Sequence, residues 1–111
     1  MIEMKKSQKK HLRELAGIAY ERDLSRCLEI LGKKFDQWRG DEISVWELND
    51  LIHEFHNDIG RELYKTYTMS DPRFPVAFGI NTGVLGLVDV RSDCRPLIER
   101  LVGSMESGDM H

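Results

Sequence analysis

A run of apolar side chains at helical spacing constrains this chain more than any other feature. Between positions 12 and 38 these side chains recur three or four residues apart, at Leu12, Ala16, Tyr20, Leu24, Leu28, Leu31, Phe35 and Trp38. Because an α-helix completes a turn in 3.6 residues, this spacing places all of them on one side of a helix. The pattern predicts a single helix over residues 9–39, about 45–50 Å long.

A glycine and a capping box mark the end of this helix and the start of a second one. Gly40 follows the last residue of the run, where glycine takes the left-handed conformation without steric cost. Ser44 and Glu47 have the spacing of a capping box. We therefore expect a second helix over residues 45–68, and the short connection predicts an antiparallel hairpin. Its inward stripe consists of Leu48, Leu51, Ile52, Phe55, Ile59 and Leu63.

Residues 76–90 are compatible with two structures. As a helix they carry one apolar stripe, formed by Val76, Ile80, Val84 and Leu87. As a β-hairpin, residues 76–80 and 84–90 pair across a turn at residues 81–83. We favour the helix, because an isolated two-stranded hairpin is marginally stable and the sequence supplies no further strand.

A last helix starts at Ser92 or Asp93, and Pro96 is tolerated in its first turn. A length of 111 residues suits one domain. The sequence thus predicts an all-α fold, in which two shorter helices pack across a long antiparallel helical hairpin. We expect residues 1–8 and 104–111 to fray at the ends of this domain.

Composition places the chain among ordinary globular domains. Its 16 Lys and Arg and 19 Asp and Glu residues give a formal net charge of −3, and 41% of its residues are hydrophobic. The longest uncharged run, residues 74–88, is shorter than the roughly 18 residues of a membrane span. The polar N-terminus lacks the apolar stretch of a secretory signal. We therefore expect a cytoplasmic protein without a membrane segment, in which Cys27 and Cys94 are buried, reduced thiols.

The second predicted helix has three faces instead of the usual two. One face is the apolar stripe, and an acidic face lies opposite it. Between them lies a third face rich in rings that join an apolar body to a polar tip, a composition favoured at interfaces. Together with one residue of the first helix, these rings are the predicted partner-contact residues: Trp38, Trp46, His53, His56, Tyr64 and Tyr67. We expect the partner to be a second copy of the chain.

His53 and His56 are also candidate metal ligands, with Asp50 as a third. Their spacing is one residue short of the His-Glu-x-x-His zinc pattern, and the first helix supplies no Glu-x-x-His motif for a di-iron site. A metal-dependent helical enzyme is therefore kept only as an alternative function. No cofactor is expected, since the glycines at 79, 83 and 86 match neither a phosphate loop nor a dinucleotide fingerprint.

Five basic residues cluster within nine positions near the N-terminus: Lys5, Lys6, Lys9, Lys10 and Arg13. Such an arm can contact a phosphate backbone, which makes a nucleic-acid-linked regulator a further alternative. A solvated terminal segment is the simpler interpretation, because no recognition motif or stacking aromatic accompanies the arm.

Three segments resemble a set of small bacterial helical proteins of unknown function: ELAGIAYER at 14–22, ELNDLIHEFH at 47–56 and RELY at 61–64. The resemblance covers about residues 12–67. It implies a helical hairpin in the bacterial cytoplasm and no particular activity, since that set has no assigned catalytic or binding residues. The favoured function is a non-catalytic, homodimeric interaction or regulatory module.

Overall fold

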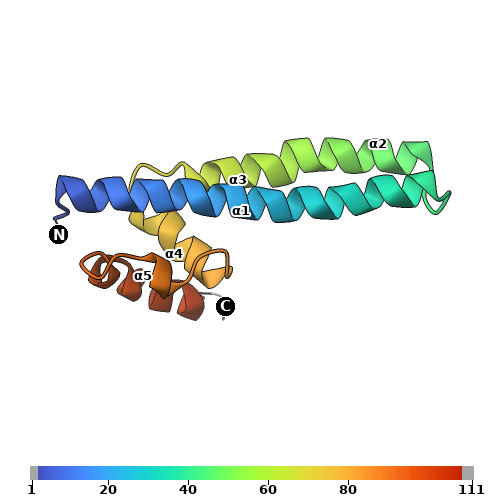
Figure 1. Cartoon of the computed structure of the whole chain (residues 1–111). Coiled ribbons are helices and arrows are strands. Elements are labelled where there is room, and N and C mark those ends of the chain that lie inside the picture. Colours follow the sequence, from blue (N-terminus) through green and yellow to red (C-terminus); the bar gives the residue numbers. More distant parts are fainter. Residues whose placement is uncertain (1–2, 109–111) are drawn as a thin grey trace.

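The computed structural model describes the backbone of residues 3–108 and the side chains as far as Gly103. Within this range the chain forms four helices and no strands, which confirms the predicted all-α fold (Figure 1). The helical segments are α1 (Lys6–Arg39), α2 (Val45–Glu54), the π-helical turn η1 (Phe55–Ile59), α3 (Gly60–Tyr67), α4 (Arg73–Asn81), the 3₁₀ turn η2 (Leu87–Asp89) and α5 (Arg95–Gly108). Because α2, η1 and α3 follow one another without a break, they count as one helix. The prediction of frayed ends lies partly outside the described residues and stays a prediction.

α1 lies alongside the continuous helix α2–η1–α3, which runs back in the opposite direction (Figure 1). The predicted capping box begins this second helix, with the Glu47 amide donating to Ser44 Oγ over 3.0 Å and the Ser44 amide to Glu47 Oε1 over 3.4 Å. At the end of α1, Asp41 and not Gly40 takes the left-handed conformation, with φ 62°. The predicted break at Gly40 is confirmed, because α1 ends at Arg39, but the left-handed residue is the next one along the chain. The amides of Asp41 and Glu42 donate back to the last turn of α1, as in a Schellman motif.

The π-helical turn changes the direction in which the end of the second helix faces. The amide of Gly60 donates to the carbonyl of Phe55, five residues back instead of four. One extra residue in a turn rotates everything after it by about 100° relative to a regular α-helix. Tyr67 is consequently 5% exposed and lies in the core. Its predicted place on the outward third face, and with it its role as a contact residue, is wrong.

The helix favoured for residues 76–90 is confirmed only as far as Asn81, and the alternative β-hairpin does not form in these residues. α4 ends at Asn81, and Gly83 follows it with φ +81°. The amide of Gly83 donates to the carbonyl of Ile80, and the amide of Val84 to that of Gly79. This Schellman motif ends the helix because glycine carries no Cβ to oppose the left-handed backbone. Leu87, predicted to continue the stripe, is 44% exposed in η2.

The buried residues gather at one end of the molecule, where α4 and α5 lie below α1 (Figure 1). α4 contacts both α1 and α3, while α5 packs chiefly against α4. The prediction that both short helices pack across the hairpin is therefore corrected for α5, which forms a further layer. The core consists of Leu12, Leu15, Ala16, Ala19, Leu63, Tyr67, Val76, Val84, Leu85, Val90, Cys94, Leu97 and Ile98. In the described range, every helix is too short or too polar to cross a bilayer.

Candidate protein-interaction surface

The two long helices continue beyond the core as an arm, which we define as residues 27–59. Several aliphatic side chains of the arm are exposed along both of its helices. Ile30 is 59% exposed, and Leu28, Val45 and Ile52 are also exposed. Of the described residues in the arm, Leu48 alone is buried. The arm therefore has an apolar surface that its own two helices do not cover.

A second stripe on α1 connects the core end to the arm. Its members recur three or four residues apart, at Leu12, Ala16, Ala19, Asp23, Cys27, Ile30, Lys34 and Gln37. The first three are buried in the core. Cys27 packs against the same core and also lines a groove of the arm, so it marks the border between the two. Asp23 and Lys34 interrupt the apolar character of this stripe, so the sequence pattern indicates the neighbouring, unbroken stripe instead.

The groove of the arm lies between α1 and the second helix and has a volume of about 180 Å³. It is lined by Cys27, Ile30, Leu31, Lys34, Leu51, Glu54, Phe55 and Ile59. Each wall contributes one charged side chain, Lys34 from α1 and Glu54 from α2. Arg26, one residue before Cys27, donates to the carbonyl of Thr82 just after α4 ends. The groove thus begins where α4 stops, and no described segment covers it.

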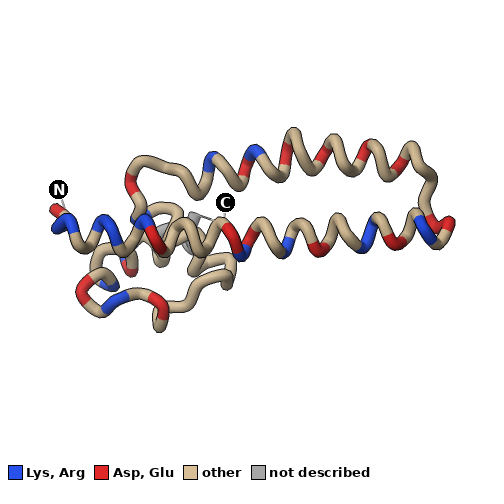
Figure 2. The backbone as a smooth tube through the Cα atoms, turned by 45° about the horizontal axis from the view of Figure 1, so that its top comes forward, with Lys and Arg blue, Asp and Glu red and all other residues tan. Residues whose placement is uncertain are grey.

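Charge differs between the two helices of the arm (Figure 2). Residues 45–60 contain no Lys or Arg, and their acidic residues are Glu47, Asp50, Glu54 and Asp58. The arm part of α1 contains Lys33, Lys34 and Arg39 beside Glu29 and Asp36. The arm therefore has an acidic edge along α2 and a more basic edge along α1.

Most of the contact residues predicted from the sequence are exposed, but they lie outside this groove. Trp46 is 75% exposed, and His53, His56, Tyr64 and Trp38 are exposed as well. None of them is among the residues that line the groove. The sequence pattern instead places the apolar groove residues of the second helix, Leu51, Phe55 and Ile59, in the hairpin core, because such a pattern does not show which apolar positions lack a neighbour. Whether the exposed rings contact a partner stays a prediction.

The structure does not bring the three candidate metal ligands together. Within the described residues, no three His, Cys, Asp or Glu side chains lie close enough to hold one metal ion, and Asp50, His53 and His56 do not form such a group. Three-residue steps along a helix separate successive side chains in angle and height, so a common ion needs ligands from a second element.

The basic residues near the N-terminus are exposed on the first turns of α1. Lys6, Lys9, Lys10 and Arg13 line a shallow depression. Arg13 donates from Nη2 to the carbonyl of Ser70 over 3.0 Å, so this arginine joins α1 to the loop before α4. Binding of nucleic acid by Lys5, Lys6, Lys9, Lys10 and Arg13 stays a prediction.

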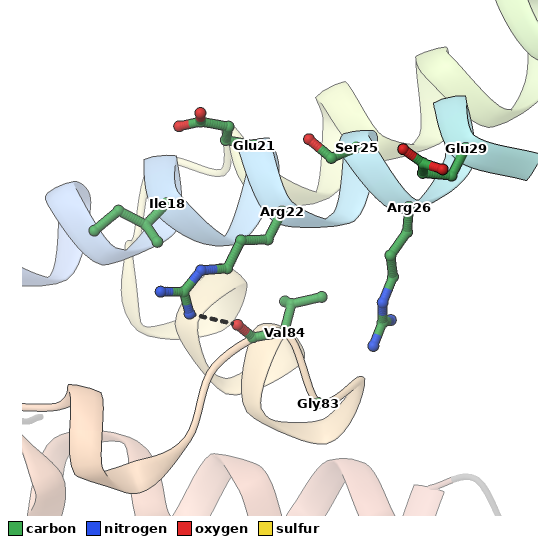
Figure 3. Close-up of a pocket in the computed structure, with 8 residues that line it drawn as sticks. All are labelled: Ile18, Glu21, Arg22, Ser25, Arg26, Glu29, Gly83 and Val84. Atoms are coloured by element: carbon green, nitrogen blue, oxygen red, sulfur yellow. Dashed lines mark hydrogen bonds between the residues drawn. The ribbon is translucent and has the colours of Figure 1, made fainter. Parts of the chain in front are cut away.

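A second depression lies where α1 meets the loop after α4 (Figure 3). Arg22 donates from Nη1 to the carbonyl of Val84 over 2.8 Å and lies 3.7 Å from Asp89 Oδ2. Arg26 donates from Nη2 to the carbonyl of Thr82 over 3.2 Å. Cationic side chains commonly bind the free carbonyls at a helix end. We therefore infer that the hydrogen bonds of both arginines hold the end of α4 against α1.

One side-chain hydrogen bond and the two free thiols beside the core are structural in character. Tyr67 Oη donates to Asp23 Oδ2 over 2.6 Å, and its ring stacks on Tyr20 and meets the edge of Phe78. Burial and the hydrogen bond to Asp23 raise the pKa of Tyr67 well above its usual value. Burial also raises the pKa values of the Cys27 and Cys94 thiols, which is opposite to the activation of a nucleophilic thiolate.

Comparisons of the chain with protein-family models, curated proteins and solved structures find no match. The resemblance to small bacterial helical proteins stays a prediction.

Proposed function

We propose that the protein is a non-catalytic interaction module that works as a homodimer, in which the arm of a second copy covers the arm groove. The observation that carries this proposal is the second stripe of α1. At the core end α4 covers it, and in the arm the same stripe is exposed at Ile30. A pair of helices is a single layer and needs a second layer to bury its apolar face.

The amount of exposed surface matches what a dimer needs. A compact monomer of 12.9 kDa exposes about 6,300 Å², whereas this chain exposes 7768 Å². Its radius of gyration is 17.1 Å, compared with about 13 Å for a compact domain of this length. The excess of roughly 1,500 Å² exceeds the roughly 800 Å² that each partner of a standard interface buries.

A second copy is the simplest occupant of the groove because a two-fold contact is self-complementary. The same apolar patch is used on both subunits, so one exposed stripe buries another. Two arms packed face to face have the composition of a four-helix bundle, whose core is formed by such stripes. This arrangement repeats in the arm the layering that α4 provides at the core end.

The test is the mass in solution by light scattering at two concentrations, with the full chain. We expect a mass approaching twice 12.9 kDa at the higher concentration. Ile30→Glu should shift it to the monomer. A symmetric contact contains Ile30 from each copy, so the substitution removes two isoleucines from it. Their loss should lower the free energy of association by about 2 kcal/mol, which is roughly a 30-fold higher Kd, before the repulsion of the introduced charges is counted.

Val88→Glu is the matched control, because Val88 is an 85% exposed aliphatic residue outside the arm. It should leave the mass unchanged. The double variant Trp46→Ala with Tyr64→Ala tests the surface predicted from the sequence and should also leave it unchanged. A monomer at every concentration, or a dimer that survives Ile30→Glu, would reject the groove as the interface.

A further inference from the structure

The position of α4 limits how two arms can pair. α4 lies on the face of α1 that carries the second stripe, as the buried residues Leu12, Ala16 and Ala19 show. It ends level with Arg26, whose side chain donates to the carbonyl of Thr82. A helix with its side chains is about 10–12 Å thick. At the core end of the groove, α4 therefore forms a second layer on the hairpin.

A parallel pair of arms, with both core ends on the same side, conflicts with this layer. Two copies of α4 would then lie between the two hairpins at their bases. Helices in contact have axes 8–10 Å apart, and two intervening helices hold the arms farther apart than that. In an antiparallel pair, each arm lies beyond the end of the partner's α4 and in the same layer as that helix.

We infer that the two arms pair antiparallel, base against tip, so that association is controlled by like charges along both edges of the interface. This inference rests on the proposed homodimer. The groove stripe of α1 consists of Cys27, Ile30, Lys34 and Gln37. If two arms of equal length overlap fully, the two-fold axis passes near residue 32 of each α1. Cys27 then lies opposite the partner's Gln37, and Ile30 lies under the methylene groups of the partner's Lys34.

The charged residues of the groove follow from the same symmetry. A two-fold axis across the arms places α1 on the partner's α1 and α2 on the partner's α2. The two Lys34 side chains then lie on one edge of the interface and the two Glu54 side chains on the other. Like charges at an interface oppose association, and salt screens them. The antiparallel dimer should therefore tighten as the salt concentration rises.

A parallel dimer predicts the opposite salt dependence. Its two-fold axis runs along the arms and places α1 on the partner's α2, so Lys34 faces the partner's Glu54. Salt would then weaken the dimer. Measuring Kd by sedimentation at about 50 and 500 mM salt distinguishes the two, with an expected tightening of roughly threefold for the antiparallel pair. Glu54→Gln should tighten the dimer at low salt and reduce its salt dependence.

Disulfide trapping tests the geometry directly. Gln37→Cys, oxidised by dissolved oxygen at mildly alkaline pH, should form a disulfide between Cys27 of one subunit and the introduced thiol of the other, identified by peptide mass. Asp36→Cys is the matched control, because Asp36 is exposed one position off the stripe. It should cross-link no more than the unmodified chain, whose Cys94 is buried.

The outcomes separate the two proposals. A disulfide between the two Cys27 residues in an unmodified dimer, or a Gln37→Cys dimer without a cross-link, overturns the antiparallel arrangement and leaves the homodimer intact. Tighter association in dilute salt than in concentrated salt also overturns it. A monomeric mass at all concentrations overturns the homodimer itself.

Discussion

The core end and the arm contain the same two helices but differ in what surrounds them. Leu12 and Ile30 occupy the same stripe of α1, yet Leu12 is 0% exposed and Ile30 59%. The difference is due to α4, which covers the stripe only as far as Cys27. An apolar stripe therefore indicates that a helix needs a neighbour, and the rest of the fold decides whether that neighbour belongs to the same chain.

The largest expected effect compares two truncations on this one stripe. Leu12→Ala should lower the free energy of unfolding by about 2–5 kcal/mol, because it opens a cavity among residues that cannot fully close it. Ile30→Ala should cost less than about 1 kcal/mol in the monomer, because most of its side chain is already in water. Urea unfolding at concentrations below dimer formation measures both. Equal losses would show that the arm is packed as tightly as the core end.

The next effect concerns the hydrogen bond at the border between the two regions. Tyr67→Phe leaves the Asp23 carboxylate without its partner and should cost about 1.5–3 kcal/mol at neutral pH. Because the folded state raises the pKa of Tyr67, its contribution is present below about pH 10 and is lost as the pH rises toward the folded pKa. Between pH 8 and 11, the free energy of unfolding measured in urea should therefore fall more steeply with pH for the unmodified chain than for Tyr67→Phe. The same pH dependence of the free energy of unfolding in both proteins would contradict a stabilising hydrogen bond from Tyr67 to Asp23.

The smallest effect compares a glycine in each region. A Cβ at Gly79 would lie 3.0 Å from Leu85 Cδ1 and 3.1 Å from the Cβ of Ala19, so Gly79→Ala should destabilise by about 1–3 kcal/mol. At Gly32 no heavy atom of the described residues lies within 4 Å, apart from the helix's own backbone and chain neighbours. Gly32→Ala should stabilise the monomer by about 0.5–1 kcal/mol through helix propensity. Thermal unfolding should show opposite signs for the two variants, and a loss of stability at Gly32 would indicate a contact in the arm.

Local signals predicted the helix boundaries well where a single motif decided them. The capping box of Ser44 and Glu47 is satisfied by hydrogen bonds within four residues, so no distant contact was needed to predict it. The end of α1 at Arg39 was also predicted correctly, although Asp41, which tolerates the left-handed conformation, takes it in place of Gly40. In residues 76–90 the apolar period suggested a longer helix, but the backbone of Gly83 ends it.

The candidate site was predicted less well because it depends on long-range packing. Projection of residues 45–68 onto a regular helix correctly placed Trp46, His53 and Tyr64 on the outside. It failed at Tyr67, because the widened turn at 55–59 has no distinct local pattern in the sequence. It also placed Phe55 and Ile59 in a closed core, although they line an open groove once α4 ends beside Arg26.

The widened turn separates two requirements that a regular helix would combine. At Gly60 a Cβ would meet the carbonyl oxygen of Phe55 at 3.3 Å, so the absence of a side chain eases this joint. On one side of the joint, the sequence must satisfy the aromatic cluster around Tyr67. On the other side, substitutions along residues 45–54 can change the surface of the arm with little effect on the alignment of that cluster.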